Sequence, residues 1–329
     1  MKILVVRFSS IGDIVLTFPV IRCLKEQVPH SEIHFLTKKS FESLTLASTF
    51  IDKKHFLAND LNETIAALKK EKFDVIVDLH NNLRTHLLSF KLGVKTNRFP
   101  KLNFQKWLLT QFKINRLPEK HVVDRYFEAV ATLGVKNDGK NNQFYIPSSE
   151  TVDCTTTYDL APKSYLAVAI GAQFATKRIP ESKLLEILSQ VNLPIVLLGG
   201  KEDFAQAESI YQKLSNPSIH NACGKHSLLA SASLVSQAKV LLTNDTGLMH
   251  IASCFAVPII TVWGNTVPAL GMYAYKPEKE VKISQFEVPN LSCRPCSKIG
   301  FQSCPKKHFD CMLKQDAGKI VEEIQSTTS

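Results

Sequence analysis

The feature that most constrains the fold is a strand–turn–helix–strand pattern over residues 240–266. A short apolar run, Val240 to Leu242, predicts a buried parallel strand that ends at a turn of Asn, Asp and Thr followed by Gly247. A helix is expected next, and Ile259 to Trp263 predict the following strand. Helices that begin behind such strands present unpaired N–H groups, which suit a phosphate.

The same alternation runs through both halves of the 329-residue chain. In the first half, Ile3 to Val6 and Asp74 to Leu79 predict strands separated by helical segments, and Tyr165 to Ala172 predict a strand in the second half. This pattern predicts doubly wound parallel sheets. The length allows two domains, which we expect over residues 1–158 and 159–329.

Composition and charge limit the expected location of the protein and the classes of partner that it can bind. The chain is 44% hydrophobic without a window of about 18 consecutive apolar residues, so a cytoplasmic protein is expected. The net charge is +10, and residues 84–125 hold ten Lys or Arg against two acidic residues. This excess of positive charge over residues 84–125, the basic field, favours an anionic membrane face, an acidic glycolipid or nucleic acid as partner. Motifs typical of nucleic-acid binding do not accompany it, which argues against nucleic acid.

The eight cysteines fall into two groups. Four are scattered and predict small buried hydrophobic side chains: Cys23, Cys154, Cys223 and Cys254. The other four cluster near the end of the chain and begin with a CxxC pair: Cys293, Cys296, Cys304 and Cys311. Their number fits a tetrahedral structural zinc site, with free thiols or a disulfide as alternatives.

Three turns after predicted strands carry polar residues. The turn before Asp13 lacks GxGxxG, so a nicotinamide dinucleotide site is not indicated, and it places a carboxylate at a helix start. The turn after Asp78 is also polar, and the loop with Lys177 and Arg178 carries two cations that suit a diphosphate. Helix capping, loop hydrogen bonding and solvated charges are the structural alternatives at these positions.

A fourth stretch, residues 103–114, mixes aromatic and cationic residues. It predicts either an interfacial amphipathic helix or, as the favoured alternative, a helix packed on its own domain.

The stretches from Asp245 to His250 and from Val257 to Thr266 closely resemble glycosyltransferase family nine, the lipopolysaccharide heptosyltransferases. The resemblance covers most of the chain and is weakest over residues 84–125. The family commonly has Gly-Pro-Thr where this chain has Gly264-Asn265-Thr266. The resemblance implies an α/β GT-B fold, in which two Rossmann-like domains with parallel sheets face each other across a cleft. The last helix often crosses back to the first domain.

The resemblance also implies roles for individual residues. Asp13 matches the proposed general base, and Lys177 matches a lysine that touches the donor's diphosphate. Glu202 is the best match to an acid that contacts the ribose, with Asp203 as its rival. The implied donor contacts are Thr176, Lys177, Glu202, Asp245, Thr246, Gly247, Leu248 and His250. The candidate acceptor contacts are Ser10, Gly12, Asp78, His80, Arg84, Arg98, Lys101 and Arg125.

By this resemblance the chain is expected to transfer L-glycero-D-manno-heptose, with inversion, from an ADP donor to a lipopolysaccharide inner-core (lipid A-core) acceptor. No cofactor is required for that scheme, and the basic field suggests peripheral contact with the cytoplasmic face of the inner membrane. Two other classes stay open: a nucleotide-sugar epimerase of the same architecture, which the basic field disfavours, and a non-catalytic protein that binds nucleotides or anionic glycolipids.

Overall fold

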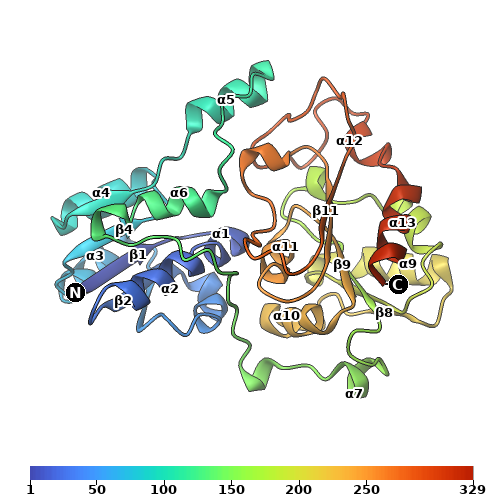
Figure 1. Cartoon of the computed structure of the whole chain (residues 1–329), viewed down its shortest axis with the longest axis horizontal. Helices are drawn as coiled ribbons and strands as arrows, with labels where there is room; N and C mark the ends of the chain where they lie inside the picture. The colour runs from blue at the N-terminus through green and yellow to red at the C-terminus, as the bar shows by residue number, and fades with distance from the viewer. Residues whose placement is uncertain (329) are drawn as a thin grey trace. The chain divides into compact units, whose positions relative to one another are not determined.

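The computed structural model describes residues 1–328, and the chain divides into two compact units (Figure 1). Unit 1 comprises Met1–Leu102, Lys120–Pro147 and Tyr275–Glu278. Unit 2 comprises Asn103–Glu119, Ser148–Ala274 and the residues from Lys279 on. The principal change of unit, after Pro147, lies upstream of the boundary expected near residue 158.

Unit 1 contains a five-stranded parallel sheet with the order β3-β2-β1-β4-β5. Its central strands are almost wholly apolar because helices cover both faces of a parallel sheet. The strands are β1 Lys2–Val6, β2 Glu32–Lys38, β3 Lys53–Leu57, β4 Val75–Asp78 and β5 Thr96–Arg98.

Helices bury both faces of this sheet. Leu4 and Val6 pack with Ile65 and Leu88 of helices α3 and α4, while α2 packs with β2 and α6. The helices are α1 Ile11–Val15, α2 Phe18–Gln27, α3 Leu61–Lys69, α4 Leu83–Leu92 and α6 Val122–Glu128, with short 3₁₀ segments η1 Lys39–Leu46 and η2 Ala131–Leu133.

Unit 2 contains a six-stranded parallel sheet with the order β11-β10-β9-β6-β7-β8. The strands are β6 Leu166–Ala169, β7 Ile195–Leu198, β8 Ile219–Asn221, β9 Val240–Asn244, β10 Ile259–Trp263 and β11 Ile283–Glu287.

Alternating side chains of these strands build two apolar layers. Val168 and Leu242 pack against α8, α9 and α13, whereas Ala167 and Leu241 pack against α10 and α11. The helices are α5 Asn103–Phe112, α7 Cys154–Tyr158, α8 Glu181–Leu188, α9 Phe204–Leu214, α10 Leu228–Gln237, α11 Gly247–Ala252, α12 Asp310–Leu313 and α13 Ala317–Thr328. The 3₁₀ segments are η3 Ser148–Glu150, η4 Ala175–Lys177, η5 Lys201–Asp203 and η6 Pro268–Leu270.

Each sheet has one point where the strand order reverses. In unit 1 it lies between β1 and β4, and in unit 2 between β6 and β9. The loops that follow the two strands at a reversal point run toward opposite faces of the sheet. A crevice therefore opens at the carboxyl ends of these strands, and α/β proteins bind ligands there. The two reversal points therefore locate the candidate sites.

The predicted α/β class with two parallel sheets is confirmed, but several details differ. The helix predicted from His121 to Gly134 ends at Glu128 and is followed by η2. Helix α5 belongs to unit 2, and α13 also lies in unit 2, packed against α8. In the part of the chain that the structure describes, no helix combines the length and apolar character that a membrane span needs.

The buried Arg22 of α2 is the clearest polar anchor in unit 1. Its guanidinium donates to both carboxylate oxygens of Asp138, at 3.2 and 2.8 Å, and to the carbonyl of Asn141 at 2.8 Å. We expect Arg22→Ala to lower the free energy of unfolding by about 3 kcal/mol, because it leaves a partly buried carboxylate unpaired. Urea denaturation followed by circular dichroism measures this.

Lys25→Ala on the same helix is the matched control. Lys25 pairs with Asp52 at 2.7 Å, but both side chains are about one-third exposed. Its loss should cost less than about 1 kcal/mol. Equal losses for the two variants would contradict the assignment of Arg22 as the anchor.

Candidate functional site

The end of β1 carries a buried arginine that fixes the turn where Asp13 lies. The Nη2 atom of Arg7 is 2.5 Å from Oδ1 of Asp13, and Nη1 donates to the Leu79 carbonyl oxygen at 2.5 Å. The Nε–H group donates to the Ser9 carbonyl oxygen at 2.8 Å. Burial is the largest single influence and lowers the pKa of the Arg7 guanidinium, but Asp13, Tyr126 and Asp78 together outweigh it, so the pKa is raised. Arg7 therefore ties the turn after β1 to the turn after β4.

The carboxylate of Asp13 is held in one orientation. Besides the ion pair with Arg7, its Oδ2 atom accepts from the Ser10 hydroxyl at 2.8 Å and from the Ser10 backbone N–H at 3.2 Å. The Asp13 side chain is 23% exposed, whereas Gly12 is buried in α1. Ser10 thus positions Asp13, and the carboxylate still reaches solvent, as an acid–base group must.

The turn after β4 is built around Asp78, which is 1% exposed. Its Oδ1 atom accepts from the backbone N–H groups of His80 and Asn81, and Arg98 Nε lies 3.2 Å from Oδ2. Asp78 therefore stabilises the turn and does not present its charge at the surface. Arg125 is equally buried. Asp78 and Arg125 are thus predicted acceptor contacts with almost fully buried side chains, whereas Arg84 is exposed and Lys101 is partly exposed.

His80 follows Asp78 and packs on Phe8, with ring centroids 4.9 Å apart. Burial, together with the nearby charges of Arg7 and Lys101, lowers the pKa of its imidazole to about 3. His80 is therefore neutral at physiological pH and acts as a polar, uncharged wall beside the Arg7–Asp13 pair.

At the reversal point of the second sheet, three loops bring charged and polar side chains together. Lys177 Nζ, from the loop after β6, is 2.6 Å from Oδ2 of Asp245, which follows β9. The hydroxyl of Thr266, from the loop after β10, donates to the same oxygen at 2.8 Å. Both charged side chains are largely buried. Charges that face each other at strand ends can bind a ligand that carries both phosphate and hydroxyl groups.

The residues around Lys177 divide into structural and exposed groups. The Thr176 hydroxyl donates to the Phe301 carbonyl oxygen at 3.1 Å and accepts from the Phe301 N–H at 2.8 Å, so it holds the residue-301 loop. Asp203 is buried, pairs with Arg178 at 2.9 Å and accepts from the Gly200 N–H. Glu202 is exposed beside it. The structure therefore gives Asp203 a structural role and leaves the Glu202 carboxylate accessible.

Helix α11 begins directly after Asp245. Thr246 is its N-cap residue and makes no side-chain capping bond, and Gly247 is its first residue. Leu248 packs against the apolar layer that includes Trp263. The side chain of His250 is 3% exposed and lies inside unit 2, so it is less accessible than the Lys177–Asp245 pair.

A separate cluster in unit 1 combines side chains of β2, β3 and the turn after α3. His34, His55 and Glu71 place ligand-type atoms within 4.8 Å of one another. The His34 ring nitrogens are each 2.8 Å from a partner, Nδ1 from His55 Nε2 and Nε2 from Glu32 Oε1. These are hydrogen-bond distances, so the cluster is a chain of hydrogen bonds between strands.

The sequence alone did not identify Arg7 or Thr266 as parts of these sites, whereas Arg178 was expected, together with Lys177, to suit a diphosphate. Arg7 was visible only as the residue that cuts an apolar strand, which is a signal of a charge placed at a strand end. Thr266 stood out only as the last residue of the Gly264-Asn265-Thr266 turn, because its partner Asp245 lies in another loop, and the structure pairs Arg178 with the buried Asp203.

Comparison with known proteins gives a consistent family. Residues 62–300 match the family model of glycosyltransferase family 9 (heptosyltransferase). Lipooligosaccharide heptosyltransferase 2 of Campylobacter jejuni is 23% identical, over 99% of this chain and 98% of that protein. The Haemophilus ducreyi protein of the same name is 26% identical, over 82% of this chain and 85% of that protein.

Solved structures show the same fold. E. coli ADP-heptose lps heptosyltransferase II superposes with a TM-score of 0.74 at 18% identity, covering 100% of this chain and 98% of that chain. E. coli heptosyltransferase WaaC, solved with ADP-2-deoxy-2-fluoro heptose, gives 0.69 at 17% identity, with 99% of each chain covered. The chain therefore has the GT-B fold of two Rossmann-like domains.

The lowered pKa of His80 predicts a pH dependence of stability. The pKa of His80 is 6.5 in the unfolded chain and about 3 in the folded chain. Between these two pH values, only the unfolded chain binds a proton at His80. The free energy of unfolding should therefore decrease as the pH falls through this window and should receive the full contribution above pH 6.5. His80→Gln should show a shallower decrease in urea denaturation between pH 7 and pH 5.

The exposed His30 provides the control for this experiment. Its backbone φ is 53°, so His30→Asn keeps a residue type that tolerates this conformation. We expect the wild-type slope for this variant. A wild-type slope for His80→Gln as well would contradict the assignment.

Proposed function

Because the chain belongs to glycosyltransferase family 9, we propose that it transfers a heptose from an ADP-activated donor to a lipopolysaccharide inner-core acceptor. The observation that carries the proposal is the Lys177–Asp245–Thr266 cluster at the reversal point of the second sheet. Relatives named lipopolysaccharide heptosyltransferases, and a relative solved with ADP-2-deoxy-2-fluoro heptose, support this choice of donor and acceptor.

In this proposal donor binding breaks the ion pair between Lys177 and Asp245, and each side chain then contacts a different part of the donor. The ammonium group of Lys177 pairs with the diphosphate. The backbone N–H groups of Thr246, Gly247 and Leu248 donate further hydrogen bonds to its oxygen atoms. Asp245, released from Lys177, accepts hydrogen bonds from the sugar hydroxyls while Thr266 keeps the carboxylate in place. The exposed Glu202 accepts from the ribose.

The chemical step is a single displacement with inversion. The acceptor hydroxyl oxygen forms a bond to the anomeric carbon as the bond from that carbon to the β-phosphate oxygen breaks, and ADP leaves with the electron pair. Asp13, oriented by Arg7 and Ser10, accepts the hydroxyl proton late in the step. Lys177 stabilises the negative charge that develops on the departing diphosphate. No cofactor takes part in this scheme.

The acceptor is an anionic glycolipid, and unit 1 offers a surface suited to its membrane. On α4, Leu83 is 87% and Phe90 is 82% exposed, and Leu87 lies between them at helical spacing. Arg84 and Lys91 are exposed on the same helix. We propose that this stripe, defined as Leu83, Leu87 and Phe90, inserts into the headgroup region of an anionic membrane while the flanking cations bind its phosphates.

In unit 2, α5 presents further aromatic side chains, with Phe104 65% and Trp107 48% exposed. The favoured expectation of a helix buried against its own domain does not describe these two residues. Their exposure supports the interfacial alternative for this helix.

The reaction is tested by offering the purified protein ADP-, UDP- and GDP-sugars with core-truncated lipopolysaccharide. Mass spectrometry should find the acceptor heavier by one heptose only with ADP-heptose. Asp13→Asn should lower kcat by about 10²- to 10⁴-fold while the donor Kd, measured by calorimetry, stays within about threefold. Lys177→Ala should weaken donor binding and also lower kcat by about 100-fold.

Lys213→Ala is the control for Lys177→Ala, because Lys213 is an exposed lysine of unit 2 paired with Glu181. It should behave as wild type. Conversion of a nucleotide sugar without any acceptor would favour an epimerase instead. Wild-type turnover by Asp13→Asn would remove Asp13 from the mechanism.

Membrane binding is tested by co-sedimentation with phosphatidylglycerol vesicles. The double variant Leu83→Ser/Phe90→Ser should bind at least about 100-fold more weakly, since burial of each of the two apolar side chains contributes about 1.5–3 kcal/mol. Tyr211→Ser, which removes a 39% exposed aromatic side chain from α9, should leave binding unchanged. Equal binding by all three proteins would contradict a role for the α4 stripe.

A further inference from the structure

The segment between β11 and α12, residues 288–309, contains neither helix nor strand. Irregular segments of this length are uncommon in compact domains unless they bind something or are tied down. Of its apolar residues, Leu291 and Phe309 pack against the core of unit 2, but Ile299 and Phe301 are 52% and 39% exposed. Its ordering therefore needs another source of free energy.

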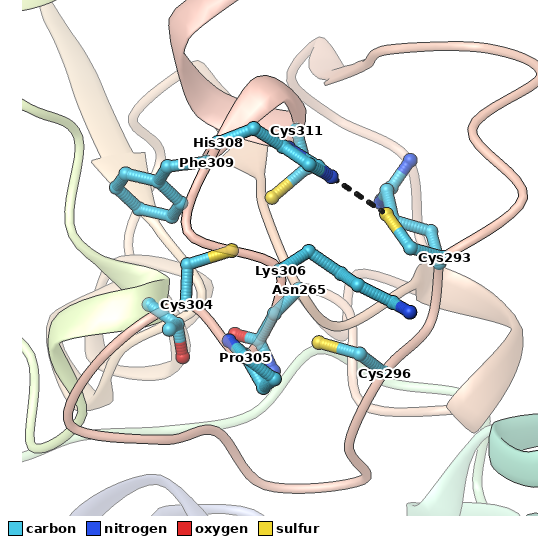
Figure 2. A pocket seen from close by; sticks show the side chains of 11 residues that line it. Asn265, Cys293, Cys296, Cys304, Pro305, Lys306, His308, Phe309 and Cys311 are labelled. Atoms are coloured by element: carbon cyan, nitrogen blue, oxygen red, sulfur yellow. Dashed lines mark hydrogen bonds between the residues drawn. The ribbon is translucent and has the colours of Figure 1, made fainter.

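Thiols gather on one side of this segment. Cys293, Cys296, Cys304 and Cys311 line one pocket together with His308, and Figure 2 shows their sulfur atoms pointing toward a common space. Cys293 Sγ lies 4.0 Å from His308 Nε2. All four are free cysteines. One CxxC pair and two further cysteines around one pocket supply the number and kind of ligands that a tetrahedral thiolate site uses.

An independent observation comes from Asn265 in the same pocket. Asn265 is 1% exposed, and among the described residues neither Oδ1 nor Nδ2 of its side chain has a hydrogen-bond partner. A buried amide without a partner costs about 1–3 kcal/mol. Its N–H group would be satisfied by a metal-bound thiolate, which carries negative charge and accepts hydrogen bonds, and such outer partners are typical of metal sites.

We infer that Cys293, Cys296, Cys304 and Cys311 bind one thiophilic metal ion, zinc or iron, as four thiolates. His308 and Asn265 lie outside this ligand set and donate to the sulfur atoms. The four thiols lose their protons when the ion binds, and the ion's two positive charges offset half of the resulting negative charge.

The site has a structural consequence for the donor loops. Arg294, between the CxxC cysteines, donates to the carbonyl oxygens of Gly264 at 2.5 Å and of Thr266 at 2.8 Å. The N–H of Cys296 donates to the Asn265 carbonyl at 3.2 Å. On the other side, Phe301 exchanges two hydrogen bonds with Thr176. The ion therefore holds the loops that carry Lys177 and Thr266, a role that rests on the proposed function.

The two loops that the segment contacts also fit closely against each other and against α12. A Cβ atom on Gly264 would lie 2.8 Å from the Thr176 carbonyl oxygen and 2.6 Å from Met312 Cε. A small displacement of the segment would therefore move the backbone on both sides of the Lys177–Asp245 pair. Loss of the ion should weaken donor binding without removing any residue that touches the donor.

The test begins with elemental analysis of the purified wild-type chain, which needs no variant. We expect about one zinc or iron per chain. The Co²⁺-loaded protein should show the intense visible d–d bands and near-ultraviolet sulfur-to-cobalt bands of tetrahedral thiolate coordination. Cys296→Ser and Cys304→Ser should lose the ion, whereas His308→Ala should keep it. Cys254→Ser, which removes a thiol of similar exposure outside the cluster, is the control and should also keep it.

ADP affinity, measured by calorimetry, distinguishes the two parts of the inference. Cys296→Ser should bind ADP about tenfold more weakly than Cys254→Ser. If the wild-type protein holds the ion but binds no ADP, the metal site is supported, and the role of the ion in ordering the donor loops is refuted. Metal-free wild-type protein with four freely reactive thiols or with disulfides would overturn the site, and so would loss of the ion in His308→Ala with retention in Cys304→Ser.

Discussion

Parallel pairing places the carboxyl ends of all strands at one edge of a sheet, and this constraint gathers the functional side chains of both units. Arg7 and Leu79 follow neighbouring strands β1 and β4, so one guanidinium can reach both turns. Lys177, Asp245 and Thr266 likewise follow three consecutive strands of the second sheet. The chemistry of the chain depends on this alignment, because each of these side chains is isolated along the sequence.

The same constraint explains how much could be predicted. Central strands such as Val240–Asn244 were recognisable because burial on both faces leaves an apolar run. The edge strands Lys53–Leu57 and Ile283–Glu287 were missed because half-exposed strands keep polar residues. Asp13 and Lys177 were singled out by the family resemblance, because their places after strands alone also fit a helix-favourable charge and a solvated cation. The role of Arg7 could not be predicted, since its partner Leu79 is 72 residues away along the chain and no local pattern encodes that contact.

Burial also separates residues that a sequence pattern treats alike. Glu202 and Asp203 are adjacent acids. The Asp203 carboxylate pairs with Arg178 and accepts from the Gly200 N–H, whereas Glu202 is exposed to solvent. Lys177 and Asp245 form an ion pair and neutralise each other. An anionic ligand must therefore compete with a carboxylate that is already in place, and only one that also satisfies Asp245 gains the full attraction of Lys177.

The segmented make-up of the two units has a consequence for inheritance and engineering. Tyr275, far along the chain, packs on His121 at 4.8 Å between ring centroids and accepts from Asn137 at 2.8 Å, so unit 1 includes a piece of chain embedded in the sequence of unit 2. Helix α5 is the reverse case. Neither half can be exchanged between homologous genes as one uninterrupted cassette. Recombination that swaps donor-binding halves would have to replace the two small insertions together with the main block.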